Sequence, residues 1–330
     1  MAKQQRIDPR LLEKRAQASG RPVPPKAKVR GAKAAPPKPA TLGTWIAGAR
    51  PQTLLLSIGP IAVGTGAASL MLDNWWDHWV RALLCLAVIV ALQIGVNYAN
   101  DYSDGIRGTD RDRVGPARLV GSGRAKPRTV LTVALVFFGL AAVAGVLVVW
   151  RSGHWWLLAV GAVCLLAAWF YTGGKRPYGY YGLGEIAALL FFGVVPTAGT
   201  MFVQVGEVSL EAWLGGVALG LLAAAVLLAN NARDRERDRA AGKRTIAVAL
   251  GGVGTRVLEV LLLLAPFGIL AFYVLFYVFA PYVYFALVAA LPAVIIVITG
   301  RTAREWLLVL RLTLLTSVMF GLGLAAALIF

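Results

Sequence analysis

Apolar residues along this chain gather in runs of about 20, which is the length of α-helix that crosses the hydrocarbon core of a bilayer. Charged or Pro/Gly-rich breaks separate one run from the next. The pattern predicts an all-α polytopic membrane protein with about nine transmembrane helices. The expected spans are residues 44–71, 79–100, 129–150, 154–172, 184–204, 209–231, 257–279, 281–299 and 307–329.

Composition agrees with a membrane protein. Of the 330 residues, 58% are hydrophobic and 15% are charged, whereas soluble domains carry about 25% charged residues. The two cysteines, Cys85 and Cys164, lie inside apolar runs, so no disulfide framework is indicated. Two histidines and two cysteines also give little basis for a zinc or haem site.

Residues 1–43 differ from the rest, and we assign them to a basic, Pro-rich and flexible cytoplasmic tail ahead of a transmembrane domain at 44–330. They lack the continuous apolar stretch of a secretory signal. Two interpretations are open: the tail contacts anionic lipid headgroups, or it is solvated and only fixes topology. No folded module for reading nucleic acid accompanies the positive charge, so a nucleic-acid partner is not expected.

Lysine and arginine are distributed unevenly among the connections. All 33 except Arg81 and Arg151 fall in the tail, in the even-numbered connections or beside them. Because cytoplasmic loops carry the excess of basic residues, this asymmetry places the N-terminus in the cytoplasm and the C-terminus outside. The predicted location is the cell (plasma) membrane.

Two apolar runs end in carboxylates and amides. One leads into NYANDYSDGIRGTD (97–110) and the other into ANNARDRERDRAAGKRT (229–245). An aspartate near the bilayer centre costs about 2.5–3.5 kcal/mol on insertion scales, so acidic residues at such places usually serve a function. Both stretches belong to even-numbered connections and are expected on the cytoplasmic face, where they could share a ligand.

Helical spacing places the side chains of each motif on common faces. If the second span continues as helix, its amides and carboxylates recur every three or four residues, and those of the sixth span do the same. The candidate ligands are Asn97, Asn100, Asp101 and Asp104 in the first stretch and Asn230, Asn231, Asp234 and Asp238 in the second.

Oxygen ligands from two helix ends suit a hard cation, and Mg²⁺ typically takes one or two carboxylates together with substrate phosphates. Basic residues such as Arg118 and Lys243 lie among the acids and would suit phosphate oxygens. On its own, RDRERDR (233–239) would be an ordinary charged loop. The matched pairs of asparagine, still within apolar runs, favour a divalent-metal diphosphate site instead.

A third element follows the fourth span. Tyr171 ends that span, and Lys175 comes after two glycines that let backbone approach a ligand closely. Both side chains could donate to a departing diphosphate. The alternative, left open by the residues alone, is a Gly-rich turn with a lysine reaching the membrane surface.

Taken together, these motifs resemble those of the UbiA-type membrane prenyltransferases over about residues 42–330. The family patterns Asn-Asp-x-x-Asp, Asp-x-x-x-Asp and Tyr-x-x-x-Lys are matched by Asn100, Asp101 and Asp104, by Asp234 and Asp238, and by Tyr171 and Lys175. The commoner first motif has a further aspartate where this chain has Gly108, with Asp110 two places later.

That departure is similar to the version in 1,4-dihydroxy-2-naphthoate polyprenyltransferases. WIAGARPQTL (45–54), GPARLVGSG (115–123), YTGGKRPYGYYGLGE (171–185) and NNARDRERDRAAGKRTIAVALG (230–251) are similar to the same enzymes. The resemblance implies a helical bundle around a cavity that opens to lipid. It also implies that the motif aspartates Asp101, Asp104, Asp234 and Asp238 hold Mg²⁺ on the diphosphate of a polyprenyl donor.

The remaining roles follow from the same resemblance. Lys175 and Tyr171 join the four aspartates as catalytic residues. The expected substrate-binding residues are Arg50, Asn97, Asn100, Asp110, Arg118, Asn230 and Asn231, with Arg50 on the diphosphate and Arg118 on a phosphate or on the carboxylate of the acceptor.

The implied activity is the Mg²⁺-dependent transfer of a polyprenyl group to 1,4-dihydroxy-2-naphthoate with decarboxylation, which yields demethylmenaquinone, diphosphate and CO₂. Its partners are polyprenyl diphosphate, the aromatic acceptor and membrane lipids. Spacing alone does not separate this acceptor from 4-hydroxybenzoate or homogentisate. A transporter with a divalent-cation site on the cytoplasmic face is the alternative from another class; transporter sites usually lie near the bilayer midplane.

Overall fold

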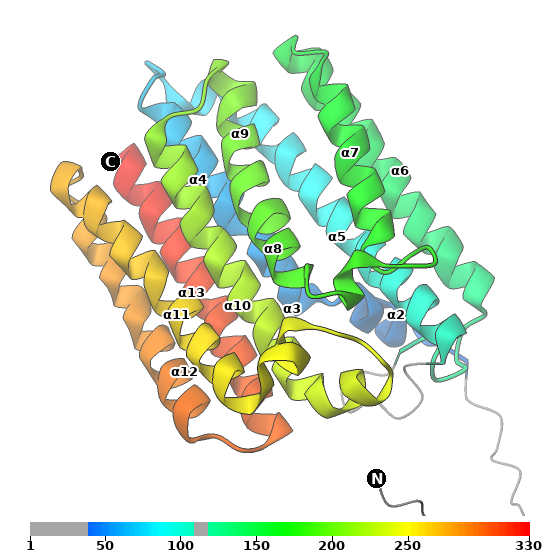
Figure 1. Ribbon diagram of the computed structural model, residues 1–330. Helices are drawn as coiled ribbons and strands as arrows, with labels where there is room; N and C mark the ends of the chain where they lie inside the picture. The colour runs from blue at the N-terminus through cyan, green and yellow to red at the C-terminus, as the bar shows by residue number, and fades with distance from the viewer. Residues whose placement is uncertain (1–38, 109–117) are drawn as a thin grey trace, which may run out of the picture. The chain divides into compact units, whose positions relative to one another are not determined.

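The computed structural model describes residues 39–108 and 118–330, and within them every regular element is helical (Figure 1). This confirms the predicted all-α fold. Nearly all of the predicted tail 1–43 lies outside the described residues. The elements are α2 (Leu42–Ala49), α3 (Pro51–Leu54), η1 (Leu55–Ser57), α4 (Ile58–Ser69), η2 (Trp75–His78), α5 (Trp79–Arg107), α6 (Pro127–Ser152), α7 (Leu157–Phe170), η3 (Tyr178–Tyr180), α8 (Gly184–Leu189), η4 (Leu190–Val194), α9 (Val195–Val205), α10 (Leu210–Ala240), α11 (Ile246–Phe276), η5 (Ala280–Ala286), α12 (Leu287–Thr299) and α13 (Ala303–Ile329).

Seven helical units among the described residues are long and apolar enough to cross a membrane. They are α5, α6, the continuous unit from α8 to α9, α10, α11, the unit from η5 to α12, and α13. The shorter apolar helix α7 and the run α3–η1–α4 correspond to the two remaining predicted spans. The structure therefore agrees with a prediction of about nine membrane helices.

The helices that carry the two acidic motifs are longer than their apolar runs. α5 has 29 residues and ends at Arg107, where Gly108 adopts a left-handed conformation with φ 73°. α10 has 31 residues and continues to Ala240. Both motifs are consequently helical, as the spacing argument required, and each lies in the last turns of its helix.

The first span is broken at Arg50. This residue separates α2 from α3 in a left-handed conformation, with φ 55° and ψ 62°. Pro51 follows and has no N–H with which to continue the hydrogen bonding of α2. The break places Arg50 in the wall of an internal cavity.

The unit from α8 to α9 contains a π-helical turn at η4, next to Pro196. A proline inside a helix leaves one carbonyl without its usual donor, and a π-turn is one way to accommodate this. Gly193 in this turn lies directly against α10. A Cβ atom on Gly193 would be 2.2 Å from the Cα of Gly220, so only glycine permits this helix crossing.

The largest cluster of buried residues lies between α4, α10, α11 and α13. Val63, Leu219, Leu263 and Phe320 are all buried in this core. On the other side of the bundle, α5 packs on α6, and α6 packs on α7. α7 itself contains no buried residue. The large core thus lies on one side of the bundle, and α5, α6 and α7 on the other side line the cavity.

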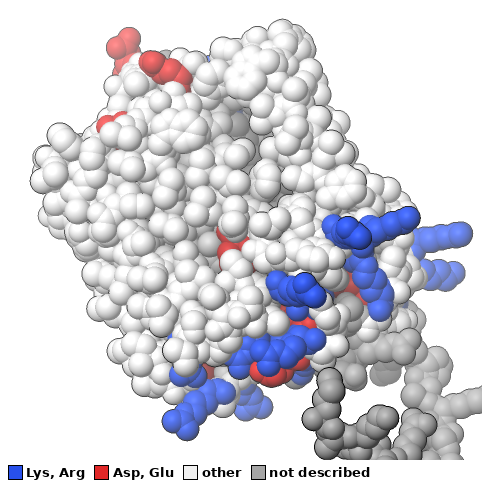
Figure 2. Space-filling model, in the orientation of Figure 1, with Lys and Arg blue, Asp and Glu red and all other residues white. Residues whose placement is uncertain are grey.

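Basic residues are concentrated at one end of the bundle (Figure 2). On the face shown in Figure 2, the lysine and arginine side chains gather at the end where α5 and α10 finish, whereas the broad middle is almost free of charge. The uncharged middle is the part that a hydrocarbon layer would surround. Both acidic motifs lie at the basic end, in line with the prediction that they share one face of the membrane.

Candidate active site at the ends of α5 and α10

Asp104 lies at the centre of the polar network. Its Oδ1 accepts a hydrogen bond from the hydroxyl of Tyr180, and its Oδ2 lies 3.5 Å from Lys243 Nζ and 4.0 Å from Arg118 Nη2. The carboxylate is 4% exposed. A buried carboxylate needs such cationic and hydrogen-bonding neighbours, because an isolated charge at this depth would be very unfavourable.

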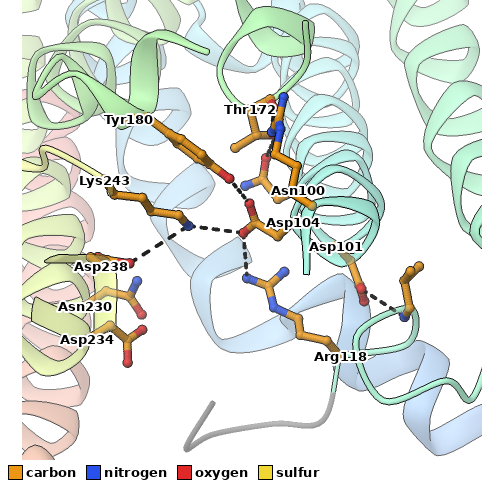
Figure 3. A network of polar contacts seen from close by, with 12 residues as sticks. Asn100, Asp101, Asp104, Arg118, Thr172, Tyr180, Asn230, Asp234, Asp238 and Lys243 are labelled. Carbon is orange, nitrogen blue, oxygen red and sulfur yellow. Dashed lines mark hydrogen bonds and ion pairs between the residues drawn. The ribbon is translucent and has the colours of Figure 1, made fainter. Parts of the chain in front are cut away.

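Lys243 links the two acidic motifs. Its ammonium lies 3.9 Å from Asp238 Oδ1 on α10 as well as 3.5 Å from Asp104 on α5 (Figure 3). It also lies 4.4 Å from the centre of the Tyr180 ring, close enough for a cation–π contact. Residues more than 130 positions apart in the sequence are thus brought to one place, as the sequence analysis expected of the two motifs.

Asp101 has a different environment, although it lies one helical turn from Asp104. Its Oδ2 accepts from the backbone N–H of Leu119 at 2.8 Å and its Oδ1 from that of Val120 at 3.1 Å. Figure 3 shows it pointing away from Lys243 and Asp238. Asp101 is 1% exposed. Its carboxylate therefore anchors the segment that begins at Arg118 and does not face the other motif.

The α10 motif is held by its own arginine. Arg233 donates through Nε and Nη2 to Asp234 at 3.0 and 2.7 Å, and through Nη2 to Asn230 Oδ1 at 2.9 Å. Asn231, on the next position around the helix, donates instead to Glu185 Oε1 of α8 at 2.9 Å. The two asparagines thus separate: Asn230 belongs to the site, and Asn231 binds a neighbouring helix.

The turn after α7 contributes Tyr180, which the sequence analysis missed. Arg107 at the end of α5 donates to the carbonyls of Thr172 and Gly174, and the N–H of Arg244 donates to the carbonyl of Tyr180 at 2.8 Å. Burial, and then the negative charge of Asp104, raise the pKa of the Tyr180 hydroxyl. The hydroxyl consequently stays protonated and donates to the carboxylate.

Of the other predicted residues, Lys175 lies apart from this network. Lys175 is exposed in the turn, and no ion pair among the described residues includes it. Asp110 lies outside the described residues. Asn100 is buried and accepts from the hydroxyl of Thr172, which joins the first motif to the same turn.

A cavity of about 490 Å³ extends from this polar end into the apolar bundle. Such a volume is within the usual range for small-molecule sites. The polar residues of its lining are Arg50, Thr53, Gln93, Asn97, Asn100, Tyr171, Tyr178, Thr200 and Asn230. The rest of the wall is largely apolar and comes from α5, α6, α7, the unit from α8 to α9, and α10, with Cys85 and Cys164 among its residues.

The side chains at the polar end fit a metal-bound diphosphate better than an enclosed metal site. Within the described residues, no three acidic, histidine or cysteine side chains come together to enclose an ion. Asp104 and Asp238 instead face each other across one ammonium group. Because Mg²⁺ often takes only one or two carboxylates and completes its shell with substrate phosphates and water, this donor set suits it.

Comparison with known proteins identifies the family. Residues 57–308 match the UbiA prenyltransferase family. The chain belongs to that family. It is 49% identical over 300 residues to a 1,4-dihydroxy-2-naphthoate octaprenyltransferase of Mycobacterium tuberculosis. The aligned region covers 88% of this chain and 98% of that protein. It is 38% identical over 241 residues to the Escherichia coli protein of the same name, covering 70% of this chain and 76% of the other.

The fold agrees with UbiA membership. A UbiA homolog from Archaeoglobus fulgidus, whose structure was determined bound to GPP and Mg²⁺, superposes with a TM-score of 0.63 at 16% identity, over 87% of this chain and 99% of that one. At this identity the likeness shows the fold. The family assignment confirms that the chain is a membrane prenyltransferase, as the motifs predicted.

Proposed function

We propose that this UbiA protein transfers a polyprenyl group from polyprenyl diphosphate to 1,4-dihydroxy-2-naphthoate, with loss of the acceptor carboxylate as CO₂ and release of diphosphate. The observation that carries the proposal is the junction of an acid- and base-rich end with a largely apolar cavity. A molecule with a diphosphate head and a long hydrocarbon tail matches that junction. The named relatives support the acceptor.

Asp104, Asp234 and Asp238, assisted by the amide oxygens of Asn100 and Asn230, are the residues proposed to hold Mg²⁺. The bound metal would neutralise the negative charge that develops on the departing diphosphate. We propose that Asp101, placed by sequence among the metal ligands, acts through the segment that it anchors, because both of its oxygens accept from backbone N–H groups.

The basic and hydroxyl groups around these carboxylates would bind the diphosphate. Lys243, Arg118 and Tyr180 contact Asp104 in this structure. When the carboxylate binds Mg²⁺, each of the three could turn a donor toward phosphate oxygens. We propose that Arg50 and Tyr171, which line the cavity, contact the same head group or the acceptor carboxylate. For Lys175 we propose a contact with the departing diphosphate, which requires its exposed turn to move toward the site.

The apolar wall would keep water away from the reacting carbon. Heterolysis of the allylic C–O bond leaves a cation that water would convert to an alcohol, so a dry cavity favours the aromatic ring as nucleophile. When the ring carbon bearing the carboxylate is attacked, CO₂ departs and returns its electron pair to the ring. This step releases no proton, so no strong protein base is required.

We also propose that the basic end faces the cytoplasm of a cell (plasma) membrane, with the N-terminal tail on the same side. The positive-inside asymmetry and the position of the basic residues support this orientation.

Product analysis tests the reaction directly. The purified protein in nanodiscs receives Mg²⁺, a polyprenyl diphosphate and either dihydroxynaphthoate or 4-hydroxybenzoate, and products are identified by mass spectrometry. We expect a prenylated, decarboxylated product from dihydroxynaphthoate alone. A prenylated 4-hydroxybenzoate that keeps its carboxylate would contradict the proposed acceptor. Binding of prenyl diphosphate with no transfer to either compound would indicate another aromatic acceptor, such as homogentisate.

The two cysteines allow an independent test of the cavity as the binding site of the tail. Both line the cavity, so prenyl diphosphate with Mg²⁺ should slow their reaction with a membrane-permeant maleimide by roughly tenfold at ten times the dissociation constant. Single Cys85→Ala and Cys164→Ala variants assign the labelled thiol. In a cysteine-free background, Val143→Cys on an exposed part of α6 is the control. Equal protection of that control would refute occupancy of the cavity.

A further inference from the structure

We infer that Gln93 and Asn97 of α5 are positioning residues that hold the backbone at Arg50 in its left-handed conformation and thereby place its guanidinium in the cavity wall. The inference deepens the proposed function, since it assumes that Arg50 contacts the diphosphate or the acceptor carboxylate. Neither Gln93 nor the clamp it forms is indicated by the motifs of the sequence.

The conformation of Arg50 is unusual within the described chain. It is the one residue other than glycine that has a positive φ there. Residues with a Cβ are disfavoured in this region, and strained backbone persists only where surrounding contacts determine it. Glycine would adopt the same break more easily, as Gly108 does after α5. An arginine at this position therefore indicates that its side chain is needed.

The surrounding contacts come from one face of α5. Gln93 Nε2 donates to the carbonyl of Thr53 at 2.8 Å, and the hydroxyl of Ser57 donates to Gln93 Oε1 at 2.9 Å. One turn later, Asn97 Nδ2 donates to the carbonyl of Ala49 at 2.9 Å. These bonds hold the chain immediately before and three residues after Arg50.

The clamp is buried and continuous with the cavity. Gln93 is 5% exposed and Ser57 is 0% exposed. Gln93, Asn97 and Arg50 all line the cavity. Replacing an amide in this clamp would remove the hydrogen bonds that fix the carbonyls on either side of Arg50, and the break could then relax. The guanidinium of Arg50 would then move from its place.

A double-mutant cycle separates positioning from general stability. Gln93→Met should lower kcat/KM for prenyl diphosphate by about 10- to 100-fold, the loss expected when a binding group is misplaced by about 1 Å. In an Arg50→Ala background the same substitution should lower it by less than about threefold, since the group that Gln93 positions is already absent.

Gln204→Met provides the matched control. Gln204 is also a buried glutamine, but its Nε2 donates to Thr65 Oγ1 at 3.1 Å, away from Arg50. Its substitution should reduce thermal stability comparably, and its effect on kcat/KM should be the same in both backgrounds. If Gln93→Met does not fold, Asn97→Leu tests the clamp at the carbonyl of Ala49.

Equal losses from Gln93→Met in the two backgrounds would overturn the inference. Failure of the proposed function would appear differently, because the wild-type protein would then transfer no prenyl group to dihydroxynaphthoate. In that case the same cycle can be measured on the binding of prenyl diphosphate with Mg²⁺, where coupling between Gln93 and Arg50 would still be expected and its absence would count against the clamp.

Discussion

Asp104→Asn is expected to lower the rate of prenyl transfer by roughly 10²- to 10³-fold without loss of the fold. The substitution keeps the shape of the side chain but removes the negative charge that Lys243, Arg118 and Tyr180 surround. Asp234→Asn should have an effect of the same order. The measurement is turnover at saturating Mg²⁺ and prenyl diphosphate, with thermal stability recorded in parallel.

Asp101 and Glu236 give the comparisons that make this prediction specific. Asp101→Asn keeps an acceptor for one of the two backbone N–H groups but not for both, so it should lower stability and affect turnover less than Asp104→Asn. Glu236, exposed on α10 and paired with Arg235, should be replaceable by glutamine with little change. A larger loss of turnover from Asp101→Asn than from Asp104→Asn would contradict the assignment of the metal ligands.

Removal of divalent ions is expected to reduce prenyl transfer by at least about a hundredfold, with recovery when Mg²⁺ is returned. Several kcal/mol of charge stabilisation would be lost, and each 1.4 kcal/mol corresponds to about tenfold in rate. The site also lies at the carboxyl-terminal ends of α5 and α10, where the helix dipoles repel anions. Without the metal, the protein is therefore expected to bind diphosphate weakly.

The same reasoning predicts a cooperative change in thermal stability. Because Lys243 already pairs with Asp104 and Asp238, Mg²⁺ alone competes with a bound ammonium group. When Mg²⁺ and prenyl diphosphate bind together, the metal can pair with the carboxylates and the ammonium group of Lys243 can pair with the diphosphate. The melting temperature should therefore rise substantially only when both are present. Full activity after exhaustive chelation, or an equal rise with prenyl diphosphate alone, would exclude the proposed metal site.

The sequence predicted the features that depend on local pattern. The number of membrane helices follows from the length of apolar runs. The helical continuation of the first motif follows from spacing, and the structure bears it out through Asp104. Helix ends were less accurate. α11 begins at Ile246, whereas the predicted span begins at residue 257. Thr245 caps the helix at its start, and a kink at Gly251, with φ 70°, connects this first segment to the apolar part of the helix.

Features that depend on distant segments could not be predicted. Asp101 and Asp104 are equivalent by motif, yet the segment after Arg118 reaches only one of them. Tyr180 enters the site because Arg107 and Arg244 hold its turn. The break at Arg50 needs amides that lie about 40 positions further along the chain. No spacing rule within one segment contains this information.

The contact between Gly193 and Gly220 has a consequence for the accommodation of hydrocarbon tails. It brings the unit from α8 to α9 against α10 with no side chain between the backbones, so this wall of the cavity is closely packed. α7, which has no buried residue and rests on α6, forms the opposite wall. We therefore expect the wall formed by the α8–α9 unit and α10 to keep its position, and the wall formed by α7 to move more easily. Tails of different bulk would be accommodated by displacement of α7, while the diphosphate end keeps its geometry.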